Sequence, residues 1–126
     1  MNRKAFDEIT DCVPGISITG KKTFAIAEPF FKDHFPERPI VPGLVLLDSL
    51  LDLSITCITR QSPNSSPILA AMRMVKFRKV VGPDQECTFS LTTEKATSFL
   101  ISVKGTISAE KSMVVDAHFI LSLGKF

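Results

Sequence analysis

The sequence carries little net charge. Its 15 Lys and Arg side chains oppose 13 Asp and Glu side chains, which leaves a formal net charge of +2 at pH 7. A protein whose main partner is nucleic acid usually gathers a much larger positive charge. The small excess therefore argues against nucleic acid as a partner, and it identifies no substrate.

Cysteine is also scarce. The three cysteines, Cys12, Cys57 and Cys87, are odd in number, widely spaced and outside any CxxC or Cys/His pattern. This spacing indicates neither a disulfide framework nor a zinc site. We expect reduced cysteines that serve in packing, and no bound metal.

Two kinds of hydrophobic segment are missing. The N-terminus MNRKAFDEIT has basic residues but lacks the apolar stretch of a secretory signal. The longest apolar segment, residues 41–58, is interrupted by Asp48 and Asp52, whereas a membrane-spanning helix needs about 20 residues with few charges. The sequence thus predicts no contact with a membrane and a cytoplasmic location.

The composition that remains is typical of one folded domain over residues 1–126. Apolar residues make up 44% of the chain and charged residues 22%, as in globular proteins. A chain of this length buries roughly two thirds of the surface that its unfolded form exposes. We therefore expect a proper hydrophobic core.

Apolar periodicity and turn signals predict an α+β fold. Residues 5–13 are ambiguous in type, while residues 16–27 alternate as in a strand, with Gly20 near a turn or bulge. Four prolines make residues 28–42 an ordered loop, and Pro42-Gly43 then opens a helix that runs to about Arg60. Further strands are predicted at residues 68–81, 86–95, 98–108 and 113–123. A curved antiparallel sheet should wrap the one long helix.

This helix is apolar on nearly every side, which is typical of a buried helix. Asp48 lies in the middle of it. An unpaired buried carboxylate costs several kcal/mol, so we expect Asp48 to have a compensating role, either in chemistry or as a structural polar residue. Burial would also favour the protonated form that a general acid needs.

The segment before the helix carries a specific pattern. It contains His34-Phe35-Pro36, then Pro39, then Val41-Pro42-Gly43, and an acid fourteen positions after the histidine. The pattern continues upstream in EPFF, residues 28–31, and downstream in KFRKVV, residues 76–81, with Asp84-Gln85. With these motifs the chain resembles the β-hydroxyacyl-acyl carrier protein dehydratases of the FabZ and FabA type over most of residues 20–123.

The resemblance implies a hotdog fold, a long central helix wrapped by an antiparallel sheet. It also implies dehydration of β-hydroxyacyl thioesters on acyl carrier protein to trans-2-enoyl thioesters, with no cofactor. His34 would be the base, Asp48 the acid for the leaving hydroxyl, and the backbone N–H of Gly43 the donor to the thioester oxygen. The implied substrate-binding residues are Phe35, Pro42, Leu44 and Asp52.

The chain departs from the family pattern at three positions. FabZ-type enzymes usually carry glutamate where this chain has Asp48, whereas FabA-type enzymes carry aspartate, so this residue does not decide the subtype. The family usually has glutamine where this chain has Asp52, and glycine where it has Asp33. Asp48 and Asp52 are one helical turn apart, and two such carboxylates oppose each other's ionisation. These changes suggest a divergent member that serves a specialised pathway, such as the synthesis of a polyene or polyketide pigment.

The resemblance also concerns partners and the acyl chain. Basic residues near the tunnel mouth of family members meet the acidic carrier protein, and here the densest basic cluster is Arg73, Lys76, Arg78 and Lys79; a solvated strand edge is an equal alternative. Family members form homodimers with shared active sites, often assembled into hexamers. Either an acyl tunnel or the core would account for five further residues, namely Met72, Met74, Phe77, Phe89 and Phe99. We expect His118 to lie on the surface of the sheet.

Two alternative functions stay open. A hotdog acyl thioesterase would also use a carboxylate near a helix start, but it would not need His34 in its HFP setting. A non-catalytic hotdog protein that binds acyl carrier protein is the other alternative, and Asp33 and Asp52 make it credible.

Overall fold

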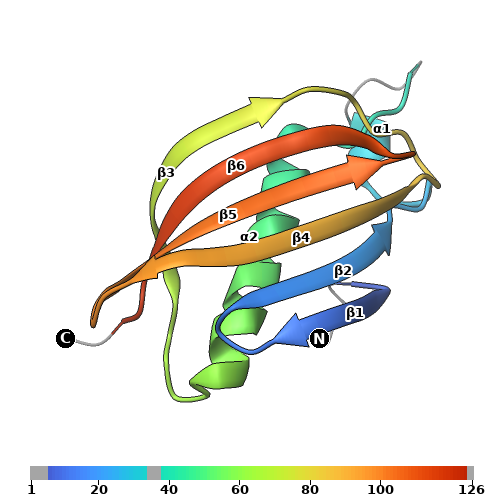
Figure 1. Cartoon of the computed structure of the whole chain (residues 1–126). Coiled ribbons are helices and arrows are strands. Elements are labelled where there is room, and N and C mark those ends of the chain that lie inside the picture. The colour runs from blue at the N-terminus through green and yellow to red at the C-terminus, as the bar shows by residue number, and fades with distance from the viewer. Residues whose placement is uncertain (1–5, 34–37, 125–126) are drawn as a thin grey trace.

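A curved antiparallel sheet wraps one long helix (Figure 1). The computed structural model describes residues 6–33 and 38–124. The sheet has six strands in the order β1-β2-β4-β5-β6-β3, and every neighbouring pair is antiparallel. The strands are β1 (Glu8–Val13), β2 (Ser17–Thr23), β3 (Ile68–Phe77), β4 (Glu86–Ala96), β5 (Leu100–Ala109) and β6 (Ser112–Ser122). This α+β arrangement is the predicted hotdog fold.

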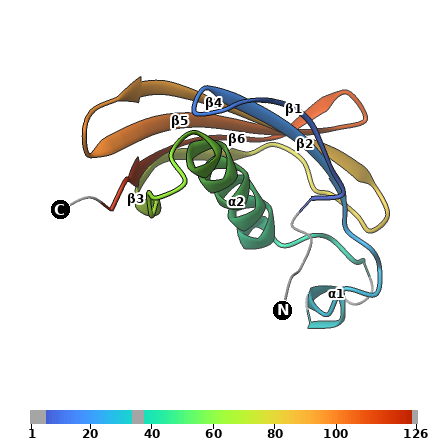
Figure 2. The same cartoon turned by 90° about the horizontal axis from the view of Figure 1, so that it is seen from below.

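The long helix α2 (Gly43–Gln61) lies across one face of the sheet (Figure 2). It begins directly after Pro42, whose φ of −60° suits a helix start, so the predicted start is confirmed. The predicted loop before it holds one unforeseen element, the single helical turn α1 (Phe30–Asp33). Pro29 precedes that turn and supplies the same local signal on a smaller scale.

The core lies between α2 and the concave side of the sheet. Leu50 and Leu53 from the helix and Phe89 from the sheet are fully buried. Gly105 on β5 makes room for the helix, because a Cβ there would lie 3.2 Å from Leu50 Cδ2. The absence of a side chain at this position lets the helix pack closely on the sheet.

The helix is not buried on all sides, and in this respect the sequence prediction is wrong. The side of α2 that faces the sheet holds its buried residues, namely Leu46, Leu47, Ser49, Leu50, Leu53, Ser54, Cys57 and Ile58. The opposite side exposes Leu44, which is 81% accessible, together with Asp48 and Asp52. The reason is geometric: a single sheet covers only one side of a helix.

The edge strand β3 does not follow a simple period of two. Its pairing with β6 shifts register between Leu69 and Ala71 and again between Met72 and Met74. Each shift inserts a residue and reverses which side the following side chains face. Met72 and Met74, which would share a face in a regular strand, therefore lie on opposite faces of the sheet. Met74 lies with Arg73 on the outer face.

Candidate active site

The start of α2 is held in place by its neighbours. The Val41 N–H donates to the Val81 carbonyl at 2.7 Å, and both side chains are buried. Among the described residues no side chain caps the helix, and the N–H groups of Gly43 and Leu44 precede the first bond of the helix, from the Val45 N–H to the Pro42 carbonyl at 3.0 Å. Such a helix start favours negative charge, which is what the predicted role of Gly43 requires.

Gly43 is also closely covered by an aromatic ring. A Cβ at this position would lie 2.8 Å from Phe77 Cζ, so any larger residue would displace the ring. Phe77 is 53% exposed and comes from the end of β3. The predicted role of Gly43 rests on its backbone N–H, and the structure adds that the space left by its missing side chain is taken up by Phe77.

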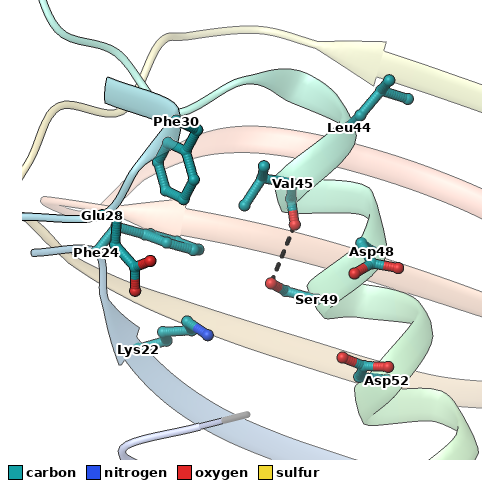
Figure 3. Close-up of a pocket in the computed structure, with 9 residues that line it drawn as sticks. All are labelled: Lys22, Phe24, Glu28, Phe30, Leu44, Val45, Asp48, Ser49 and Asp52. Atoms are coloured by element: carbon teal, nitrogen blue, oxygen red, sulfur yellow. Dashed lines mark hydrogen bonds between the residues drawn. The ribbon is translucent and has the colours of Figure 1, made fainter. Parts of the chain in front are cut away.

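Two hollows meet at the exposed side of α2. The first is a polar cavity of about 690 Å³, drawn in Figure 3, lined by Lys22, Phe24, Glu28, Phe30, Leu44, Val45, Asp48, Ser49 and Asp52. The second is an apolar groove of about 210 Å³ between α2 and the sheet, lined by Leu44, Leu47, Asp48, Leu51, Leu69, Met72 and Phe119. Leu44 and Asp48 line both, so the Asp48 carboxylate stands between a polar and an apolar compartment.

Asp48 itself is exposed in the single chain, contrary to the prediction that it is buried. Its neighbour Ser49 is 7% exposed and donates its hydroxyl hydrogen to the Val45 carbonyl at 3.0 Å. The helix thus turns Ser49 toward the sheet and Asp48 away from it. The single chain therefore leaves the Asp48 side chain open to solvent.

Several predicted residues fall outside this geometry or outside the described residues. His34 and Phe35 belong to residues 34–37, which the structure does not describe, so their roles stay predictions. Asp52 lines the polar cavity, one helical turn beyond Asp48. Pro42 directly precedes the helix and is not among the described residues that line the two hollows.

The candidate tunnel residues are divided by the structure. Met72 lines the apolar groove. Phe89 is fully buried in the core, and Phe99 is 61% exposed just before β5 begins. Met74 lies on the outer face with Arg73, because the register shift separates it from Met72.

The predicted basic cluster is exposed along β3 and the residues that follow it, and its role stays a prediction. Arg73 lies in a shallow outer hollow with Ser102 and His118. Arg78 Nη2 is 3.6 Å from Asp116 Oδ2, and Lys76 is paired across the strands with the same Asp116. His118 lies on the outer sheet surface as expected, with its Nδ1 3.4 Å from Glu94 Oε1.

Lys22 is absent from the site residues predicted from the sequence. Counting in steps of two along β2 from the buried Ile18 reaches Gly20 and then Lys22, so alternation alone would have placed Lys22 on the helix side. Glu28 was noticed only as part of a motif. Both line the polar cavity.

The cysteines are free thiols, as expected. Burial raises the pKa of Cys57, and it raises the pKa of Cys87 to about 11. Within the described residues, no group of three or more His, Cys, Asp or Glu side chains is arranged to hold a metal ion. In the same part of the chain, no helix has the length and apolarity needed to span a membrane.

Comparison with known proteins agrees with this fold. Among solved structures, the dehydratase heterocomplex ApeI:P from Xenorhabdus doucetiae matches with a TM-score of 0.67 and 17% identity, over 85% of this chain and 88% of that chain. An HP0420 homologue from Helicobacter felis matches with a TM-score of 0.74 and 12% identity, over 98% of this chain and 81% of that one. At such identities these likenesses show the fold, and the chain is of the hotdog class.

Sequence relatives show to which family within the hotdog class the chain belongs. The 3-hydroxyacyl-[acyl-carrier-protein] dehydratase FabZ of Levilactobacillus brevis is 33% identical over 113 residues, 88% of this chain and 76% of that protein. The FabZ of Rickettsia bellii is 28% identical over 116 residues, 90% of this chain and 80% of that protein. The family described as ApeI-like, ApeI dehydratase, matches residues 12–115. The chain belongs to this dehydratase family, and it is a lyase.

Proposed function

We propose that the protein dehydrates β-hydroxyacyl thioesters carried on acyl carrier protein to trans-2-enoyl thioesters. The observation that carries the proposal is the place of Asp48, a carboxylate between an apolar groove and a polar cavity at the start of α2. An acyl chain fits the groove chemically, and the β-hydroxyl group needs a proton donor at its polar end. The relatives named as 3-hydroxyacyl-[acyl-carrier-protein] dehydratases support this substrate class.

In this scheme His34 removes a proton from the α carbon, and the electrons form an enolate whose oxygen is held by the Gly43 N–H. The enolate then expels the β-hydroxyl group, to which Asp48 supplies a proton, so that water leaves and the double bond forms. Phe35, Pro42, Leu44 and Asp52 would surround the substrate. No metal or cofactor takes part in the scheme.

A homodimer with shared active sites is part of the proposal. Leu44, 81% exposed, and Met72, 42% exposed, line the same groove, and β3 is an edge strand with an unpaired side. Apolar groups and an unpaired strand edge at one place favour a covering partner. A second copy would bury Asp48 and bring its own His34 to the site; assembly into hexamers is a further step of the same proposal.

A specialised acyl pathway, of the polyene or polyketide type, is the proposed setting. The aspartates at positions 33, 48 and 52 depart from the FabZ pattern, and the match to an ApeI-like family supports a use distinct from FabZ. We propose a cytoplasmic enzyme whose carrier protein docks on Arg73, Lys76, Arg78 and Lys79. Of these, Arg78 and Lys79 directly follow Phe77, which covers the helix start.

The test is the reversible hydration of a short enoyl thioester, followed by the loss of its ultraviolet absorbance. We expect activity in the wild type, and a fall of about 10²–10⁴-fold in Asp48→Asn and in His34→Ala. Release of free thiol without hydration would support the thioesterase instead. Binding of carrier protein without turnover at any chain length would support the non-catalytic alternative.

A further inference from the structure

The polar cavity holds more negative than positive charge. Among its nine described lining residues, Glu28, Asp48 and Asp52 are acidic, and Lys22 supplies the positive charge. Figure 3 shows the Lys22 side chain extending from β2 toward α2, where Ser49 and Asp52 line the cavity. One ammonium group therefore partly offsets the charge of several carboxylates.

The surroundings of Lys22 hold it at this place. Its Nζ lies 5.2 Å from the centroid of the Phe24 ring, within the range of a cation–π interaction. Phe24 is 1% exposed, and its ring packs edge-on against Phe30 with centroids 6.1 Å apart. The Lys22 ammonium thus lies over a buried aromatic ring, which is itself packed against a second ring.

Dehydration places new demands on this charge balance. Negative charge builds on the thioester oxygen, and Asp48 becomes negative once it has given its proton to the hydroxyl group. The other carboxylates of the cavity oppose both changes, because like charges repel more strongly where water is partly excluded. A cation held in the same cavity reduces that opposition.

We propose that Lys22 is a positioning residue of the dehydratase, whose ammonium offsets the negative charge of Asp52 beside Asp48. Its kinetic consequence rests on the proposed function. The proposed charge coupling between Lys22 and Asp52, however, needs no substrate, because both residues line the cavity of the free protein, where the coupling can be measured. Lys22 itself touches no reacting atom in this scheme.

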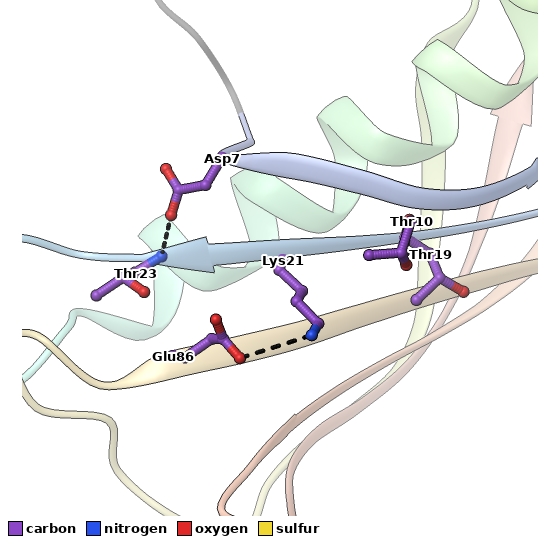
Figure 4. A network of polar contacts seen from close by, with 6 residues as sticks. All are labelled: Asp7, Thr10, Thr19, Lys21, Thr23 and Glu86. Carbon is purple, nitrogen blue, oxygen red and sulfur yellow. Dashed lines mark hydrogen bonds and ion pairs between the residues drawn. The ribbon is translucent and has the colours of Figure 1, made fainter.

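The first experiment compares Lys22→Met with a matched control, Lys21→Met. Lys21 is the preceding residue of β2, faces the other side of the sheet, and reaches Glu86 Oε1 at 3.8 Å (Figure 4). We expect kcat for enoyl hydration to fall about tenfold in Lys22→Met with a smaller change in KM, and Lys22→Arg to restore most of it. Lys21→Met should keep the wild-type rate. Full activity in Lys22→Met would overturn the proposal.

The second experiment repeats Lys22→Met in an Asp52→Asn background. Asp52→Asn removes the negative charge that Lys22 is proposed to offset. The fall in kcat caused by Lys22→Met should therefore shrink to about twofold or less. An equal loss in both backgrounds would show that Lys22 acts independently of Asp52. Circular dichroism and thermal melting of each variant establish that the fold is intact.

The third experiment needs no activity. Among the described residues, the charged groups that line the cavity with Asp52 are Lys22 on β2, Glu28 before α1 and Asp48 on α2. Carbon-13 spectra of the free protein should show Asp52 taking up its proton at higher pH in Lys22→Met than in the wild type, and unchanged in Lys21→Met. An unmoved titration overturns the proposal even in an active enzyme. A moved titration in a protein without hydratase activity supports the charge coupling and overturns the dehydration reaction.

Discussion

Both sides of α2 carry apolar residues, but their surroundings differ. The side facing the sheet is closed by the protein's own core, with Leu50 and Leu53 fully buried. The opposite side leaves Leu44 and Asp48 open and forms two hollows with β2, β3 and the α1 region. The comparison teaches that apolar residues of one helix can have different roles. Those on the buried side stabilise the fold, and those on the open side are available to the substrate and the second copy proposed above.

The largest expected effect separates the two sides by stability. Leu50→Ala should lower the free energy of unfolding by about 2–5 kcal/mol, because it leaves a cavity against Leu91 and Gly105. Leu44→Ala removes an exposed side chain and should cost less than about 1 kcal/mol. Urea unfolding followed by circular dichroism measures both. Equal losses would mean that the open side is packed within the chain after all.

The next effect tests what covers the open side. Met72→Asp places a charge in the apolar groove and should weaken self-association by about tenfold or more, with loss of activity. Val13→Asp is the matched control on the other edge strand, since Val13 is 44% exposed and Met72 is 42% exposed. Sedimentation at several protein concentrations distinguishes them. Dimers of unchanged affinity in Met72→Asp would rule out this groove as the contact.

A smaller effect is expected in thiol chemistry. Thiolate is the reactive form, and the raised pKa values of Cys57 and of Cys87, the latter about 11, keep both protonated near pH 8. In the folded protein a disulfide reagent should label Cys12, which is only half-buried, well before the other two. Raising the pH should speed labelling of Cys57 and Cys87, and unfolding should expose all three. Mass spectrometry of labelled peptides gives the order in which the three cysteines react. Early labelling of Cys57 would show that the side of α2 facing the sheet is accessible to the reagent.

The smallest effect is on stability at Asp48. Because the side chain is exposed in the single chain, Asp48→Asn should change the free energy of unfolding by no more than about 0.5 kcal/mol while it removes activity. Thermal melting beside the hydration assay measures the contrast. A large change in stability would give Asp48 a structural role instead.

Much of the fold was predictable because it depends on local signals. Pro42-Gly43 marks the start of α2, and the tight turn between β5 and β6 lies between the strands predicted at residues 98–108 and 113–123. Its two central residues, Glu110 and Lys111, have φ of 51° and 62°, as in two-residue hairpins. Such signals act over a few residues and are readable in the sequence.

The rest depends on contacts that the sequence does not display. The exposure of Asp48 follows from the sheet covering one side of α2, which a helix pattern alone cannot show. The outward position of Met74 follows from a register shift against β6. Lys22 joins Asp52 in one cavity although 30 positions separate them in the chain. In the candidate site, motifs therefore identified residue types, and only the structure shows which compartment each one lines.

The order of the strands also has a consequence for how the chain folds. β4, β5 and β6 are joined by short turns and pair with their neighbours in sequence, so this meander needs only local contacts. β3 precedes the meander but pairs with its last strand, β6. During synthesis β3 cannot pair with β6 until residues 112–122 have left the ribosome, and its apolar residues lack that partner in the meantime. β3, the strand that lines the groove, thus gains its partner strand only when synthesis is nearly complete. We expect the nascent chain to be most prone to aggregate before that pairing forms.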